Sequence, residues 1–199
     1  MYVPSSYRIE DPATLHAFIA RYGFATLVTG GDEPMATHLP LLLDRDRGPL
    51  GTLIGHVARA NSQWRADHAN CASLAIFHGP HAYLSPAWYR SNAPAVPTWN
   101  YAVVHAKGTI SLMQDPERVR AVVRALSQQY EPTPLPRNNQ VVGEAEEKLL
   151  EAIVAFEMPI DRLEGKFKLS QNRAREDQIG AVEGLEKQGD ADSQALAEF

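Results

Sequence analysis

The sequence predicts a mainly β fold with flanking helices, and three observations support it. Short runs rich in β-branched and aromatic residues follow one another from residue 24 to residue 113, separated by turns that contain glycine or proline. A capping aspartate precedes proline at Asp11-Pro12 and Asp115-Pro116, as at helix starts. An apolar fraction of 44% in 199 residues can bury one core of ordinary size. About six or seven short strands with tight turns favour a closed or nearly closed barrel.

Each element of the first half has its own local signal. A helix begins at Pro12, presents Leu15, Phe18 and Ile19 on one face, and ends at Gly23. The predicted strands are Phe24–Thr29, Met35–Leu43, Leu50–His56, Ala72–Phe77 and His81–Leu84, with a turn at Gly79-Pro80, and then Tyr101–Met113 as a long strand or a hairpin broken near Gly108.

The second half adds helices and one more strand. The predicted elements are a helix from Pro116, a loop over Glu131–Gly143, a short helix over Glu144–Leu150, a half-buried strand over Val154–Asp161 and a last helix over Arg173–Leu185. We therefore expect one domain over residues 1–185 with a helical insertion at about 115–150. Residues 186–199 are polar and are expected to form a frayed tail outside the core.

Composition excludes several classes of function. The net charge is -5 and the sequence pI is about 5.8, with no basic block, so direct binding to DNA is not expected. The lone cysteine, Cys71, lies in an apolar run and is expected to be a small buried side chain. With no signal segment and no apolar run of membrane-spanning length, we expect a cytoplasmic protein.

Three segments carry candidate binding chemistry, and each has two interpretations. After the strand that ends at His56, Arg59 and Asn61 stand either at a phosphate-binding helix start or as a solvated arginine and a helix cap. Between residues 83 and 101, Trp88 and Trp99 beside prolines form either the wall of a heterocycle pocket or a structural loop. Near residue 168, Lys166, Lys168 and Arg173 form either a second phosphate-facing surface or ordinary solvated charges.

Six stretches occur in an order that is characteristic of one family. They are Met1–Pro4, Thr37–Pro40, Gly55–Asn61, Gly79–Pro86, Val96–Tyr101 and Gly165–Arg173. Together they resemble the PaiB-type FMN-binding negative transcriptional regulators, nearly over the whole chain. Two positions depart from the family pattern: Ser62 stands where proline is more usual, and Phe167 stands where tryptophan is more usual, which removes an indole donor.

The resemblance implies a split β-barrel related to pyridoxamine-phosphate oxidase and flavin reductases. It implies a homodimer that holds FMN in a groove at the subunit interface. The implied cofactor contacts are His56, Ala58, Arg59 and Asn61 for the phosphate and ribityl chain, Thr37 and His38 for the edge of the isoalloxazine ring, Trp88 or Trp99 for the ring, and Lys168, Gln171 and Asn172 to complete the site, in one arrangement from the partner subunit.

Three functions remain open from the sequence. The first is a negative transcriptional regulator that acts indirectly or senses the flavin or redox state. The second is an FMN-dependent oxidoreductase of a small molecule, in which no residue stands out as the catalytic acid or base. The third is a haem-binding split barrel, with His78, His81 or His105 as the axial ligand. No spacing of histidines predicts another metal site.

Overall fold

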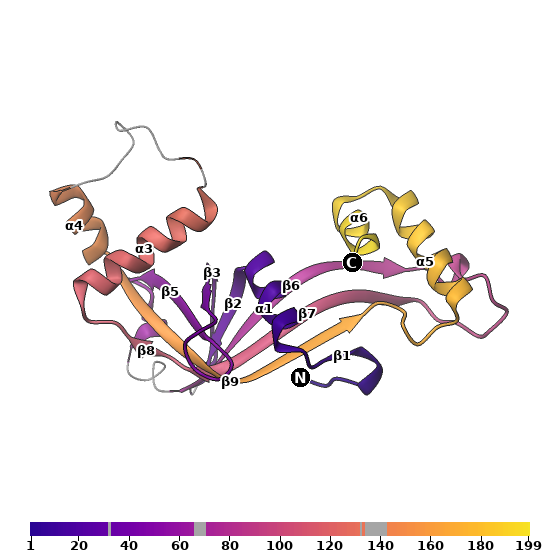
Figure 1. Ribbon diagram of the computed structural model, residues 1–199, viewed down its shortest axis with the longest axis horizontal. Helices are drawn as coiled ribbons and strands as arrows, with labels where there is room; N and C mark the ends of the chain where they lie inside the picture. Colours follow the sequence, from indigo (N-terminus) through magenta and orange to yellow (C-terminus); the bar gives the residue numbers. More distant parts are fainter. Residues whose placement is uncertain (32, 66–70, 132, 134–142) are drawn as a thin grey trace. The chain divides into compact units, whose positions relative to one another are not determined.

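A computed structural model of the protein describes residues 1–31, 33–65, 71–131, 133 and 143–199 (Figure 1). The strands pair in the order β3-β2-β6-β7-β9-β5-β4, and β1 and β8 also pair with β9. Their bounds are β1 Arg8–Ile9, β2 Phe24–Thr29, β3 Met35–Pro40, β4 Leu42–Asp44, β5 Thr52–Ala58, β6 Ala72–Leu84, β7 Thr98–Thr109, β8 Ser111–Leu112 and β9 Ile153–Lys168. The helices are α1 Pro12–Arg21, α3 Pro116–Tyr130, α4 Glu144–Glu151, α5 Arg175–Gln188 and α6 Ala191–Ala197, with short 3-10 turns η1 Ser5–Tyr7, η2 Ser62–Trp64 and η3 Pro86–Trp88. The predicted class, mainly β with flanking helices, is confirmed.

The chain forms two compact units. Unit 1 contains residues 1–18, 78–105 and 164–199, and unit 2 contains residues 19–77 and 106–163. Three strands, β6, β7 and β9, have residues in both units. The domain boundary that we expect at residue 185 stays a prediction.

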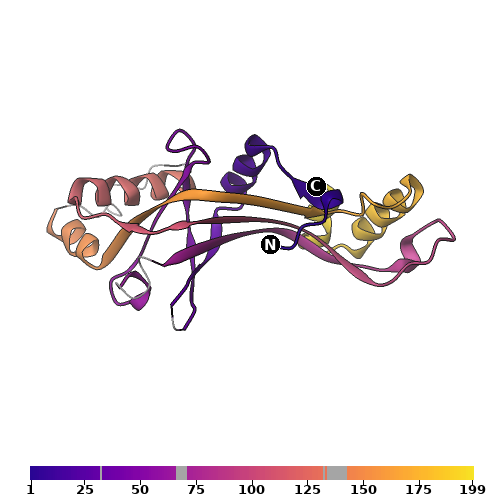
Figure 2. The same ribbon diagram turned by 90° about the horizontal axis from the view of Figure 1, so that it is seen from below.

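Helices α3 and α4 of unit 2 confirm the two helices predicted from Pro116 and over Glu144–Leu150, and their description as an insertion stays a prediction. Asp115 caps α3 by accepting a hydrogen bond from the Glu117 amide at 3.0 Å. The apolar stripe of α3 joins a buried cluster with strand residues, while Arg120 forms ion pairs with Glu146 and Glu147 of α4. Figure 1 and Figure 2 both show the two helices side by side. Of the predicted loop over Glu131–Gly143, residues 132 and 134–142 lie outside the described ranges.

Strand β6 corrects the prediction of two strands with a turn at Gly79-Pro80. It runs unbroken from Ala72 to Leu84, and its buried positions change from odd to even numbers near Gly79, the phase change that a β-bulge produces. A side chain at Gly79 would meet the Phe18 ring at 2.8 Å, so the glycine is required by close packing rather than by a turn. The phase change also leaves His78 and His81, three residues apart, on exposed positions.

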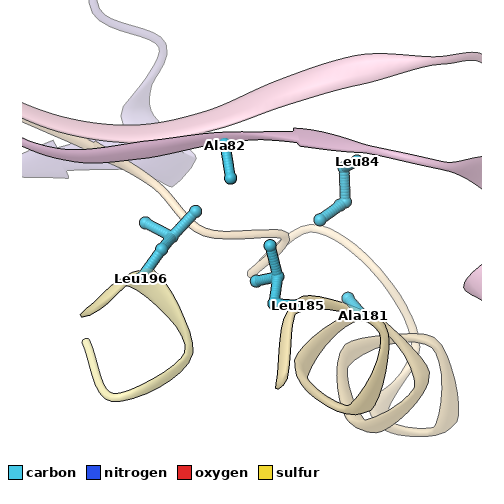
Figure 3. Close-up of a cluster of buried hydrophobic side chains, with 5 residues drawn as sticks. All are labelled: Ala82, Leu84, Ala181, Leu185 and Leu196. Carbon is cyan, nitrogen blue, oxygen red and sulfur yellow. The ribbon is translucent and has the colours of Figure 1, made fainter. Parts of the chain in front are cut away.

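The expected frayed tail is wrong, because residues 191–197 form α6 and join the core of unit 1. Asp190 caps this helix through the Ser193 amide at 2.9 Å. Leu196 is 4% exposed and packs with Leu185 of α5 and Leu84 of β6 (Figure 3). The polar composition of residues 186–199 gave no sign of this helix. A single leucine and a capping aspartate are enough to dock a short helix against an existing apolar cluster.

Candidate functional site

The predicted site residues divide between the two units. Unit 2 holds Thr37, His38, His56, Ala58, Arg59 and Asn61. Unit 1 holds Trp88, Trp99, Lys168, Gln171 and Asn172. Each group is described within its own unit.

In unit 2, Thr37 and Asn61 lie together around a buried glutamine. Asn61 caps η2 by accepting the Gln63 amide at 2.8 Å, and its own amide group donates to Thr37 Oγ1 at 2.8 Å. The Thr37 hydroxyl donates in turn to Gln63 Oε1, and Gln63 Nε2 donates to the Leu27 carbonyl at 2.9 Å. Gln63 is 2% exposed. No sequence signal marked it, because its partners come from other strands.

Arg59 is held at the end of β5 by backbone carbonyls. Its guanidinium donates to the carbonyls of Glu151 and Ile153, the second at 2.8 Å, and its amide donates to the Ala152 carbonyl. In the described residues 59–65 the chain after β5 forms the 3-10 turn η2, so Arg59 and Asn61 do not stand at an α-helix start within that range, and residues 66–70 lie outside the described ranges. The Arg59 side chain is exposed, yet these hydrogen bonds hold its positive charge at a fixed position.

The remaining unit 2 residues differ in exposure. His38 is exposed and its Nδ1 lies 3.0 Å from Thr26 Oγ1. Ala58 is exposed at the last position of β5, opposite Ile153. His56 is half-buried, and its Nδ1 is buried without a hydrogen-bond partner among the described residues. A buried, unpaired imidazole nitrogen is suited to a ligand that brings a polar group.

Burial of His56 predicts a loss of stability in acid. Burial lowers the pKa of His56 below the ordinary value, because protonation is unfavourable in the apolar surroundings. The unfolded chain therefore takes up this proton first as the pH falls, so the contribution is fully present above the ordinary histidine pKa and is lost as the pH falls through it. We expect His56→Gln to flatten the pH dependence of urea-unfolding free energy between pH 8 and pH 5. An equally steep dependence in the variant would show that other groups cause it.

In unit 1, Lys168 stands at the last position of β9 beside a small pocket. Its ammonium group donates to Thr98 Oγ1 and to the Trp99 carbonyl. Burial lowers the pKa of Lys168, and the positive charges of Lys166 and Arg173 lower it further. The pocket has a volume of about 160 Å³ and is lined by Tyr7, Tyr89, Val96, Thr98, Asn100, Lys168, Ser170, Asn172 and Arg173.

A tight turn follows Lys168 and involves Gln171. The Gln171 side chain donates to the Phe167 carbonyl and accepts the Leu169 amide at 2.7 Å, so it stabilises the turn. Ser170 has a φ of 64° and is 4% exposed, a left-handed conformation that is unusual for a residue with a side chain. Such strain in a buried turn is typical of functional sites.

The two predicted tryptophans have different environments. Trp99 is 54% exposed, and its ring lies 6.3 Å from His81 and 6.1 Å from Tyr83 between ring centroids. It lines a hollow of about 330 Å³ together with His78, His81 and Tyr101. Trp88 packs instead against the glycines of α5. The exposed aromatic face around Trp99 therefore offers a flat apolar surface, whereas the partly buried Trp88 indole packs against α5.

These residues fit FMN in chemical type. The cofactor needs cations and donors for its phosphate and a flat surface for its ring. Unit 1 supplies the Lys168 ammonium and the exposed ring of Trp99, and unit 2 supplies Arg59 and the unpaired nitrogen of His56. Bound FMN would supply the redox chemistry.

The described parts of the chain also bear on metal binding and on membrane insertion. No group of three or more His, Cys, Asp or Glu side chains is arranged there to hold a metal ion. None of the described helices combines the length and apolar content that crossing a bilayer requires.

Comparison with known proteins identifies the family. The family described as "Putative FMN-binding domain" matches residues 1–162. The chain is 34% identical over 206 residues to the protease synthase and sporulation protein PAI 2 of Bacillus subtilis (strain 168), with 100% of this chain and 96% of that protein covered.

Two solved structures share the fold. The FAD and haem binding protein from Mycobacterium smegmatis has a TM-score of 0.63 at 16% identity, covering 88% of this chain and 80% of that one. Flavocytochrome Anf3 from Azotobacter vinelandii has a TM-score of 0.64 at 14% identity, covering 81% and 69%. The predicted split β-barrel is confirmed by these similarities. The chain therefore belongs to the PaiB-type FMN-binding family, and it is an FMN-binding split-barrel protein.

Proposed function

We propose that the chain is a cytoplasmic homodimer that holds FMN at the subunit interface and lowers the expression of other genes through the state of its flavin. The observation that supports this best is in unit 1, where the Lys168 ammonium donates to the backbone carbonyl of Trp99, a residue whose ring is 54% exposed. A cation next to a stacked flavin ring favours the negatively charged reduced form and tunes its potential. That is the property that a redox sensor needs.

Each predicted residue has a role in this proposal. Arg59 and His56 contact the phosphate and ribityl chain together with Ala58 and Asn61. Thr37 and His38 lie along the ring edge, and Trp99, rather than Trp88, stacks on the ring, because Trp88 packs against α5. Lys168, Gln171 and Asn172 complete the site, with Gln171 acting through the turn that it stabilises.

Direct reading of an operator is not part of the proposal. The net charge of -5 and the absence of a basic block oppose the phosphate contacts that such binding requires. The relative from Bacillus subtilis carries a name that refers to protease synthesis and sporulation, which is consistent with a regulatory role. We therefore expect regulation to pass through a protein partner or through a reaction of the flavin.

Titration with FMN, followed by flavin fluorescence, tests the site. We expect saturation at one FMN per subunit, and Arg59→Ala and Lys168→Ala each to weaken binding by about tenfold, the size of a lost charge-assisted hydrogen bond. Arg59→Ala should also reduce the preference for FMN over riboflavin, because only FMN carries the phosphate. Lys187→Ala, an exposed change in α5, is the matched control. Unchanged affinity in both site variants would refute the assignment.

Three measurements on the purified protein distinguish the functions. Bleaching of bound FMN by NADPH would favour the oxidoreductase, and a Soret band in place of flavin absorbance would favour haem. Retardation of DNA that is selective for sequence and sensitive to salt would favour direct repression. A dimer that binds FMN and shows neither NADPH oxidation nor DNA retardation is the expected result.

A further inference from the structure

The small pocket beside Lys168 contains groups that the FMN proposal does not use. Arg173 and Asn100 line it, together with Thr98 and Tyr89. Its volume of about 160 Å³ is below the range of about 300–1,000 Å³ of sites for drug-sized ligands. A whole flavin is too large for it.

The charge in this pocket is positive. Lys168 and Arg173 line it, Lys166 is close enough to lower the Lys168 pKa, and no carboxylate side chain is among its lining residues. The nearby carboxylate of Asp177 already accepts hydrogen bonds from the amides of Arg90 and Ser91 and from the Ser91 hydroxyl. Gathering cations without lining carboxylates costs free energy, which a bound anion recovers.

The Arg173 guanidinium is fixed in place. It stacks over the Tyr89 ring at 4.8 Å from the centroid and donates to the Pro94 carbonyl at 3.3 Å. A planar guanidinium held by an aromatic ring loses little freedom when it binds a carboxylate or phosphoryl group. This arrangement favours an anion over a neutral ligand.

Asn100 adds a second, independent feature. It is 4% exposed, its amide nitrogen donates to Ser170 Oγ at 3.0 Å, and its Oδ1 is buried without a partner among the described residues. A buried carbonyl oxygen without a hydrogen bond is costly, so the site favours a ligand that brings an O–H or N–H group. The strained backbone of Ser170, which is the partner of Asn100, lies in the same pocket wall.

We propose that this pocket binds a small organic anion that also carries a hydroxyl or amino donor, as a ligand distinct from FMN. Arg173 takes the anionic group, and Asn100 Oδ1 accepts a hydrogen bond from the hydroxyl or amino group of the ligand. The evidence for this anion site comes only from unit 1. The role of the anion as the sensed molecule or the substrate rests on the proposed function.

Calorimetric titration of the full-length protein, with and without saturating FMN, tests the proposal. The probes are glycolate, which has a carboxylate and a hydroxyl, and acetate, which lacks the hydroxyl. We expect glycolate to bind about threefold to tenfold more tightly than acetate, and Asn100→Leu to remove that difference. Arg173→Gln should weaken both probes by about tenfold and leave FMN affinity unchanged. Arg175→Gln, an exposed change two residues away, should alter nothing.

Several outcomes would overturn the proposal. If neither probe shows saturable binding, there is no anion site. If the two probes bind the unaltered protein with equal affinity, the ligand hydroxyl does not donate a hydrogen bond to Asn100. Displacement of one FMN by one anion would assign the pocket to the FMN phosphate. Because Asn100→Leu disturbs the contact with Ser170, its thermal unfolding is measured first, and Asn100→Ala is the second variant. If the protein does not bind FMN at all, the titration of glycolate and acetate in the absence of FMN still tests the anion site.

Discussion

Replacing Gln63 by leucine is expected to lower the free energy of unfolding by about 3 kcal/mol, because one buried and two half-buried polar groups lose their partners together. The Gln63 side chain donates to the carbonyls of Leu27 and Met35 and accepts from the Thr37 hydroxyl. Leucine has a similar volume but no polar atom, so the buried bond to the Leu27 carbonyl and the half-buried bonds to Met35 and Thr37 are all lost. Urea unfolding measures the change.

The control for Gln63 is Gln188→Leu, an exposed change in α5, which should stay within about 0.5 kcal/mol of the unaltered protein. Gln63→Leu should also bind FMN more weakly in any fraction that stays folded, because the Gln63 side chain no longer holds Thr37, which in turn is hydrogen-bonded to Asn61. A cost below about 1 kcal/mol would mean that the three groups find other partners.

Replacing Gly184 by alanine is expected to destabilise the protein by about 2 kcal/mol, although alanine favours an isolated helix over glycine by about 1 kcal/mol. A side chain at this position would overlap the indole of Trp88, and one at Gly180 would overlap the Trp88 backbone carbonyl. The two glycines therefore form the surface of α5 that receives Trp88. Thermal and urea unfolding measure the effect.

A double-mutant comparison isolates the cause of the Gly184 effect. In a Trp88→Ala background the clash is absent, so Gly184→Ala should become neutral or stabilising, as helix propensity predicts. If the single variant Gly184→Ala is more stable than the unaltered protein, the close packing of Trp88 on α5 is wrong.

Local signals were sufficient for most of the fold. The cap and proline at Asp115-Pro116 marked the start of α3, and alternation marked β2, because both depend on residues close in the chain. The Gly79-Pro80 pair was misread as a turn, since the bulge that accommodates it depends on the packing of Phe18 against Gly79. The helix α6 was missed because its stability comes from the docking of Leu196.

The candidate site was predictable only in part. Lys168, Trp99, Arg59, Asn61 and Arg173 were named from short motifs, but Gln63 gained its significance from contacts with residues of other strands. The partners of Gln63 lie 26 to 36 positions away in the sequence, and no spacing rule connects them.

The sequence by itself determined the class of elements, the order of the strands along the chain and the FMN-binding family, because periodicity, caps and ordered motifs are properties of neighbouring residues. The tertiary structure decided where polar groups are left unpaired and where cations gather, as at Asn100 and Lys168. Those properties depend on burial and on distances between strands, which a linear pattern does not encode.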